Sequence, residues 1–214
     1  MLYFAPLWFL SYTNAILVVV PKLQNFPVNR IFAQNASMKL QIVSPETNPK
    51  EVQRLYEIMI HGYRVTEVDI WGEDYSRMFP EEFQEIIDRK ELIGAWIADV
   101  PVGSIHTYRL NENTFAFGLF SVDFNFKGQN IGRKLIEAAE ELAKERGATF
   151  MELEILRLRD KELTAKRQLH DWYVRLGYEL ISTTDFVDRK PDKAEKASNF
   201  IAPSVFDCYR KRLK

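Results

Sequence analysis

The sequence contains little of what metal sites and disulfide frameworks need. Among its 214 residues it has a single cysteine, Cys208, and three histidines, His61, His106 and His170. One cysteine excludes an internal disulfide and any zinc site built on paired cysteines. The histidines do not have the spacing of a metal-binding motif. We therefore expect no metal.

The chain also lacks an excess of either charge. It has 29 Lys and Arg against 30 Asp and Glu, a formal net charge of −1. Nucleic-acid-binding domains usually carry a basic excess, so we expect no nucleic-acid partner. There is no internal repeat, and a hydrophobic content of 46% is ordinary for a globular protein. This length suits one domain, or one domain with an appendage.

The N-terminal segment differs from the rest. Its apolar run, LYFAPLWFLSYTNAILVVV, approaches the length of a membrane span, but the polar residues 11–14 interrupt it. No basic residue precedes the run, as one would in a signal peptide. Three interpretations stay open: an extension outside the functional domain with Met38 as the real start, a membrane anchor or export signal, and a helix packed on the domain. We expect residues 1–37 to form an extension and linker, residues 38–214 to form the domain, and the localisation to be cytoplasmic unless the extension is an anchor.

From Met38 onward, hydrophobic patterns with the periods of strands and helices alternate. Helices are predicted at 50–63, 79–90, 133–146 and 162–176, and strands at 39–43, 92–98, 102–110, 114–122, 150–156, 178–184 and 205–213. Residues 66–78 and 188–199 are predicted loops, and residues 99–101 a hairpin turn. The order β-α-α-β-β-β-α-β-α-β-β indicates a mixed α/β (α+β) domain that is mostly a meander.

The segment KGQNIG, residues 127–132, lies between a strand and a strongly patterned helix. A helix N-terminus exposes unpaired N–H groups and a partial positive charge, and small residues let an anion approach the backbone. Lys127, Arg133 and Lys134 add positive charge. The segment lacks the spacing of a P-loop or a dinucleotide fingerprint. It therefore predicts either a phosphate cradle or an ordinary β–α turn.

The surrounding residues favour the cradle. Residues 122–132 resemble the acetyl-CoA-binding motif of the GNAT N-acetyltransferase superfamily, with Lys127 in the usual Arg/Gln place, Asn130 in that of the first glycine, and Gly132 in the last place. Lysine keeps the charge without the guanidinium geometry, and asparagine tolerates a left-handed backbone. The segment HDWYVRLGYEL resembles the second signature of the family. The resemblance covers about residues 39–213.

The resemblance implies a mostly antiparallel sheet flanked by helices, with strands four and five splayed apart. The pantetheine arm of acetyl-CoA would pair with the fourth strand by strand addition, and the pyrophosphate would bind the following loop. The implied cofactor-binding residues are Phe120, Ser121, Val122, Lys127, Gly128, Gln129, Asn130, Ile131, Gly132 and Arg133. The implied activity is acyl-CoA-dependent N-acyl transfer, most simply of acetyl, to a primary amine by direct attack. The alternatives are a regulatory acyl-CoA-binding protein and an interaction module.

Two proton transfers accompany such a reaction. Tyr173 stands where the family has its tyrosine acid, although it could also be a core aromatic residue. Glu154 is the predicted base, acting directly or through water, and Glu152 shares its strand face, which could also be merely solvated. Asp123 could act or only cap the loop, and His106 could be a satisfied core histidine. A water chain could replace any dedicated base.

In this family the first two helices and their loop usually line the acceptor site. Tyr63, Trp71 and Tyr75 are the predicted substrate residues, and the acids Glu67, Asp69, Glu73 and Asp74 would attract an ammonium group. The same stretch could be a surface loop anchored by aromatic residues. Residues 188–203 could form a lid or a disordered insertion. We expect acetyl-CoA as co-substrate, an amine acceptor that is a small molecule or a peptide, and a monomer or homodimer.

Overall fold

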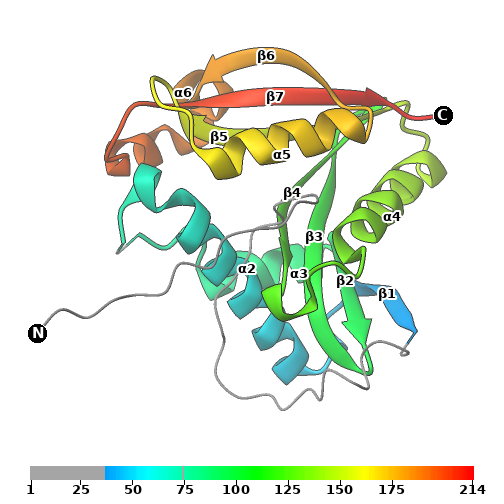
Figure 1. Cartoon of the computed structure of the whole chain (residues 1–214). Helices are drawn as coiled ribbons and strands as arrows, with labels where there is room; N and C mark the ends of the chain where they lie inside the picture. The colour runs from blue at the N-terminus through cyan, green and yellow to red at the C-terminus, as the bar shows by residue number, and fades with distance from the viewer. Residues whose placement is uncertain (1–36, 74) are drawn as a thin grey trace, which may run out of the picture.

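The computed structural model describes residues 37–73 and 75–214, so the predictions about residues 1–36 lie outside the described residues. Figure 1 shows the arrangement of the elements along this part of the chain. The strands are β1 (Met38–Val43), β2 (Leu92–Ile97), β3 (Val100–Asn111), β4 (Thr114–Val122), β5 (Phe150–Leu158), β6 (Glu179–Asp185) and β7 (Ser204–Arg212). The helices are α2 (Pro49–Trp71), α3 (Pro80–Asp88), α4 (Ile131–Glu145), α5 (Thr164–Arg175) and α6 (Phe186–Arg189), with the 3₁₀ segments η1 (Phe124–Phe126) and η2 (Pro191–Asn199).

The strands form one seven-stranded sheet in the order β1-β2-β3-β4-β5-β7-β6. Every pair of neighbours is antiparallel except β4 and β5, which are parallel. This confirms the predicted mixed α/β fold with a mostly antiparallel sheet. The predicted order of strands and helices is confirmed as far as β6, and the structure adds helix α6 between β6 and β7.

The sheet opens between β4 and β5. These strands pair only where residues 114–116 meet residues 150–152, and they then diverge (Figure 1). A bulge in β4 accompanies the divergence: Leu119 has a φ of +43°, and the register with β3 shifts around it. Bulges bend a strand and increase its local twist. The edge of β4 beyond Ala116 therefore faces a gap, as the predicted splay requires.

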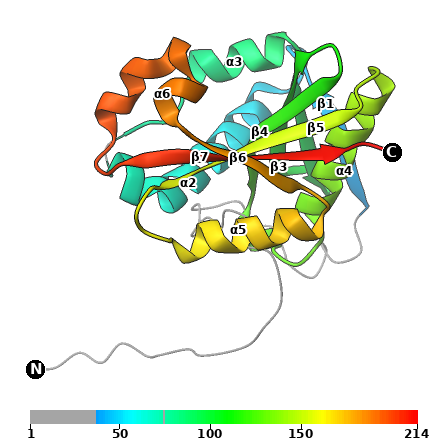
Figure 2. The same ribbon diagram turned by 90° about the horizontal axis from the view of Figure 1, so that it is seen from above.

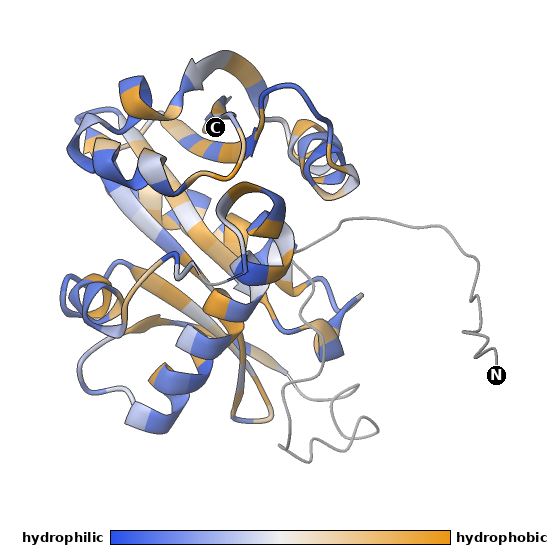
Figure 3. Cartoon of the chain, turned by 90° about the vertical axis from the view of Figure 1, so that its left-hand side faces the viewer, coloured by the Kyte–Doolittle hydropathy of each residue, from blue (hydrophilic) through white to orange (hydrophobic). Residues whose placement is uncertain are grey.

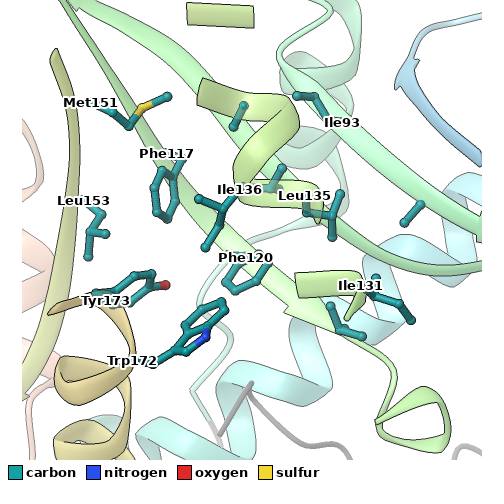
Figure 4. Close-up of a cluster of buried hydrophobic side chains, with 14 of the residues drawn as sticks. Ile93, Phe117, Phe120, Ile131, Leu135, Ile136, Met151, Leu153, Trp172 and Tyr173 are labelled. Atoms are coloured by element: carbon teal, nitrogen blue, oxygen red, sulfur yellow. The ribbon is translucent and has the colours of Figure 1, made fainter. Parts of the chain in front are cut away.

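The helices cover both faces of the sheet (Figure 2). The largest buried cluster joins α4 and α5 to one face, through residues such as Leu135, Ile136 and Trp172 (Figure 4). Two smaller clusters lie on the other face, one with α2 and α3 and one with the end of α2 and α6. Apolar and polar residues alternate along most elements in Figure 3. The gap between β4 and β5 thus connects two differently covered faces.

Three local predictions were wrong. Residues 66–71 continue α2, because Ile70 and Trp71 extend its buried stripe. Residues 188–199 are helical in α6 and η2, and η2 buries none of its residues, so it has no apolar periodicity to find. The β2–β3 hairpin turns at residues 98–99, both with positive φ. Val100 and Pro101 belong to β3.

Within residues 37–73 and 75–214, no helix combines the length and the apolar character that crossing a bilayer requires. The predicted membrane anchor concerns the N-terminal segment, so it stays a prediction.

Candidate active site

The loop before α4 has the backbone geometry of an anion-binding turn. Asn130 is the N-cap of α4 in the left-handed conformation, with φ 60° and ψ 16°, and Gly128 has a φ of +84°. Asparagine is one of the few residues other than glycine that tolerate this region. The first helical bond runs from the Lys134 amide to the Asn130 carbonyl at 3.2 Å. The amides of residues 131–133 therefore precede the helical hydrogen-bond ladder.

A buried ion pair holds this loop in place. Asp123 accepts hydrogen bonds from the backbone and the side-chain amide of Asn125, both at 2.9 Å, and it caps η1. Its other oxygen pairs with Arg54 of α2 at 2.6 Å. Arg54 also donates to the Pro101 carbonyl at 2.8 Å. Asp123 thus has the capping role, and its oxygens are occupied by structural bonds.

Replacing Asp123 with alanine is expected to lower the free energy of unfolding by about 3–5 kcal/mol, because it breaks a buried ion pair. Urea unfolding measures this cost. Asp171→Ala is the matched control, because Asp171 forms an exposed pair with Arg167 and its loss should cost at most about 0.5 kcal/mol. Equal losses in the two variants would contradict a structural role for Asp123.

A cavity of about 560 Å³ lies beside the gap, on the face covered by α2, α3 and α6. It brings together residues from both splayed strands, from α2, and from α5. The predicted site residues that line it are Tyr63, Glu67, Trp71, Tyr75, His106, Phe120, Glu152, Glu154 and Tyr173. The predicted residues of the α4 loop do not line this cavity, and neither do Ser121 and Val122.

Tyr173 extends from α5 into the opening between the strands. Its ring packs against Phe117 of β4, with centroids 5.9 Å apart, beside the stacked Phe120 and Trp172 (Figure 4). Only 5% of Tyr173 is exposed, yet it lines the cavity. Burial, together with Tyr63 and Tyr209, raises the pKa of Tyr173 above its usual value. The hydroxyl therefore keeps its proton at neutral pH, as a donor must.

Glu152 and Glu154 face the cavity from β5, opposite the buried Leu153 and Ile155. Glu154 pairs with Arg189 at 2.6 Å and with Lys190 at 2.9 Å. Glu152 accepts from Arg210 at 2.6 and 2.8 Å. The alternative of a merely solvated face is therefore wrong. Both carboxylates belong to an ion-pair network.

His106 has the environment of a satisfied histidine. Its Nε2 lies 3.1 Å from a carboxylate oxygen of Glu91, and its ring stacks on Tyr108 with centroids 4.8 Å apart. Burial lowers the pKa of His106, although Glu91 partly offsets this effect. A base needs a nitrogen open to the acceptor, and the Nε2 of His106 is already bonded to Glu91.

The structure brings the three predicted acceptor residues together at one cavity, and their role in binding an acceptor stays a prediction. Tyr63, Trp71 and Tyr75 all line the cavity, and the rings of Trp71 and Tyr75 stack with centroids 4.3 Å apart. The predicted acidic lining is wrong for Asp69 and Glu73, which are exposed and lie outside the cavity lining. Asp74 lies outside the described residues.

Glu67 lies at the cavity but is neutralised by its neighbours. It accepts from Trp71 Nε1 at 2.9 Å and pairs with Arg77 and with Lys166. Burial would raise the pKa of Glu67, but Arg77 and Lys166 outweigh it, so the pKa is lowered. Glu67 is therefore a charged structural partner of two cations rather than an open anionic site for an ammonium group.

The cationic residues that line the cavity were not predicted: Arg77, Arg89, Lys166, Arg189, Lys190, Lys193 and Lys196. Lys166 was detectable, because it lies two turns before Tyr173 on the buried stripe of α5. A lysine at such a position is rarely buried without a partner. Arg77 and Arg189 come from irregular or short segments that carry no periodic signal.

Within the described residues, no group of three or more His, Cys, Asp or Glu side chains is placed to hold a metal ion. The prediction of a metal-free site stays a prediction.

The split mixed sheet, with a helix N-terminus on one side of the gap and a cavity lined by both apolar and polar residues on the other, defines the class of fold. The family model described as "Acetyltransferase (GNAT) family" matches residues 52–178. The chain belongs to this family. A search of curated protein sequences finds no significant match.

Solved structures show the same fold at low sequence identity. Ard1 from Thermoplasma volcanium matches with a TM-score of 0.57 and 14% identity over 83% of this chain and 98% of its own. An aminoglycoside 6'-N-acetyltransferase complexed with coenzyme A matches with a TM-score of 0.59 and 16% identity over 83% of this chain and 97% of its own. N-acetylglutamate synthase from Neisseria gonorrhoeae, complexed with coenzyme A and N-acetyl-glutamate, matches with a TM-score of 0.57 and 14% identity over 84% of this chain and 36% of its own.

Proposed function

We propose that the protein is an N-acetyltransferase that transfers the acetyl group of acetyl-CoA to a primary amine by direct attack. The observation that supports the proposal is the gap between β4 and β5, because β4 leads to the N-terminus of α4 and the cavity that Tyr173 lines lies beside the gap. The co-substrate and the acceptor would reach this gap from opposite faces of the sheet. The coenzyme A complexes of the similar structures support this assignment.

The residues around the α4 loop fit the co-substrate. The edge of β4 at Phe120, Ser121 and Val122 would pair with the amide groups of the pantetheine arm. The amides of residues 127–133 would bind the pyrophosphate, because the helix N-terminus favours anions. The thioester supplies an acyl group activated toward amines.

In the reaction, a carbon–nitrogen bond forms and the carbon–sulfur bond breaks. The amine loses one proton and the sulfur gains one. We assign the donor role to Tyr173, whose protonated hydroxyl lies at the gap. Glu154 lines the same cavity and is the proposed acceptor of the amine proton, acting through water. The proposed domain is residues 38–214, and cytoplasmic localisation and a monomeric or homodimeric state remain predictions.

Acetyl-CoA is expected to raise the melting temperature of the protein. Ligand linkage gives about 2.7 kcal/mol of stabilisation at a hundredfold excess over Kd, or roughly 5–10 °C for a domain of this size. The shift should grow with acetyl-CoA concentration, and adenosine should produce a smaller one. No shift at millimolar acetyl-CoA would exclude both the enzyme and a regulatory CoA-binding protein. A shift without release of the CoA thiol on addition of amines would favour the regulatory alternative.

A further inference from the structure

The buried end of the cavity carries more positive than negative charge. Glu67 is 3% exposed at its side chain and Lys166 is 6% exposed, and the Lys166 Nζ lies 3.1 Å from Glu67 Oε1. Arg77 pairs with the other oxygen of the same carboxylate. Two cations therefore share one anion. Lys166 and Glu67 have little access to water, while the Arg77 side chain is 27% exposed. Buried charges need compensation, because their desolvation is costly.

None of the other described cations at the cavity is as buried as Lys166, and the exposed Arg89 and Lys193 also line it. Arg189 and Lys190 share Glu154 and Glu152, and their side chains are 32% and 26% exposed. Lys196 pairs with Glu82 at 3.5 Å and is 28% exposed. Water can screen these groups. Among the cavity residues that the structure describes, the Glu67 cluster is where a bound anion would compensate buried charge most directly.

This cluster lies next to the proposed reaction centre. The Arg77 guanidinium stacks over the ring of Tyr63 at 4.2 Å, and Tyr63 lines the same cavity as Phe120 of β4. Lys166 lies two turns before Tyr173 on α5, and both line the cavity. An anion at the cluster would therefore lie in the cavity that Phe120 and Tyr173 line.

We propose that the acceptor is an amine that also carries a carboxylate, and that Arg77 and Lys166 bind this carboxylate beside Glu67. A carboxylate has one negative charge, which balances the single excess positive charge of the cluster. A phosphate, with a charge nearer −2, would overcompensate it. Arg77 offers the planar fork that matches a carboxylate. Burial lowers the pKa of Lys166, and a second carboxylate would favour its charged form. The inference rests on the proposed function, because it names the substrate class of the same site.

Calorimetric titration of N-acetylated amino acids and their matched amides into the CoA-loaded protein tests the inference without turnover. These compounds are the products of the proposed reaction, and each pair differs only in the carboxylate. We expect the best acid of the panel to bind at least about tenfold more tightly than its amide, because charge-assisted hydrogen bonds are about twice as strong as neutral ones. Acids that bind no better than their amides, or that do not bind at all, would overturn the inference.

Variants test whether Arg77 and Lys166 bind the carboxylate. Arg77→Gln and Lys166→Met should each remove most of the preference for the acid. Arg167→Gln is the matched control, because Arg167 neighbours Lys166 but is 57% exposed at its side chain, and it should keep the preference. Melting temperatures identify a variant that fails to fold, and Arg77→Gln then decides, since Arg77 is less buried. A preference that survives both variants would place the carboxylate elsewhere and overturn the assignment.

The experiments distinguish failure of the proposed function from failure of the carboxylate inference. If neutral amines release CoA thiol while acids show no binding preference, the transferase is supported and the inference is wrong. If no amine of any class releases thiol although acids bind better than their amides, the carboxylate-binding site is supported and the transferase activity is not.

Discussion

Replacing Gly132 with glutamate is expected to raise the Kd for acetyl-CoA by at least about a hundredfold, or about 2.7 kcal/mol. Gly132 is in the first turn of α4, directly after Ile131, where the amides precede the helical ladder. Glutamate would place bulk and a negative charge at the expected position of the pyrophosphate. Calorimetric titration of acetyl-CoA measures the loss.

The same substitution tests folding and binding separately. A carboxylate in the first turn of a helix interacts favourably with its macrodipole, by about 0.3–1 kcal/mol, but Gly132 is buried, so the melting temperature of the variant shows whether the added side chain disturbs folding. Gly132→Ala is the matched control. Alanine adds only one methyl group and favours the helix, so binding should be kept. If Gly132→Glu binds acetyl-CoA as tightly as the wild type, the pyrophosphate binds elsewhere on the protein.

Removal of the Tyr173 hydroxyl is expected to lower kcat by about 10²–10⁴, the usual contribution of general acid catalysis. Tyr173→Phe keeps the ring contacts with Phe117 and Tyr209, so acetyl-CoA binding should change little. The raised pKa of Tyr173 keeps the group protonated well above pH 8. Its deprotonation should therefore not limit the wild-type rate between about pH 6 and 9. Steady-state kinetics across this range provide the measurement.

Tyr178→Phe is the matched control for Tyr173→Phe. Tyr178 is also buried, and its hydroxyl donates to Glu140 at 2.8 Å, outside the cavity. Its loss should cost about 1 kcal/mol of stability and leave kcat almost unchanged. A Tyr173→Phe enzyme with the wild-type kcat would exclude Tyr173 as the acid.

The elements that carry periodic patterns were predicted well from the sequence. Helix α4 was predicted two residues short at its start, and β4 was predicted with its observed bounds. The αL conformation of Asn130 agrees with its place in the motif. These features depend on local residues, whose chemistry determines the backbone nearby. Trp71 and Tyr75 were also predicted from a local feature, the aromatic residues of one segment, and both line the cavity.

The charges of the site could not be predicted in the same way. Glu67 was expected to attract an ammonium group, but its cationic partners come from a loop and from α5, far along the chain. Arg189 meets Glu154 only because α6 folds over β5. Such pairings depend on the tertiary arrangement, and no periodicity reports them. The sequence therefore predicted the backbone of the loop before α4 more accurately than the charges around the cavity.

The most direct test of the proposed function is amine-dependent release of CoA thiol from acetyl-CoA, together with detection of the acetylated amine. The panel contains amino acids, their amides, polyamines and peptides, and acetyl-CoA without an amine measures background hydrolysis. We predict that at least one amine gives free thiol and acetylated product in equal amounts, and that Tyr173→Phe slows both. If every amine leaves thiol release at the hydrolysis background while acetyl-CoA still binds, the protein is not an acetyltransferase for these classes of amine and the central claim is contradicted.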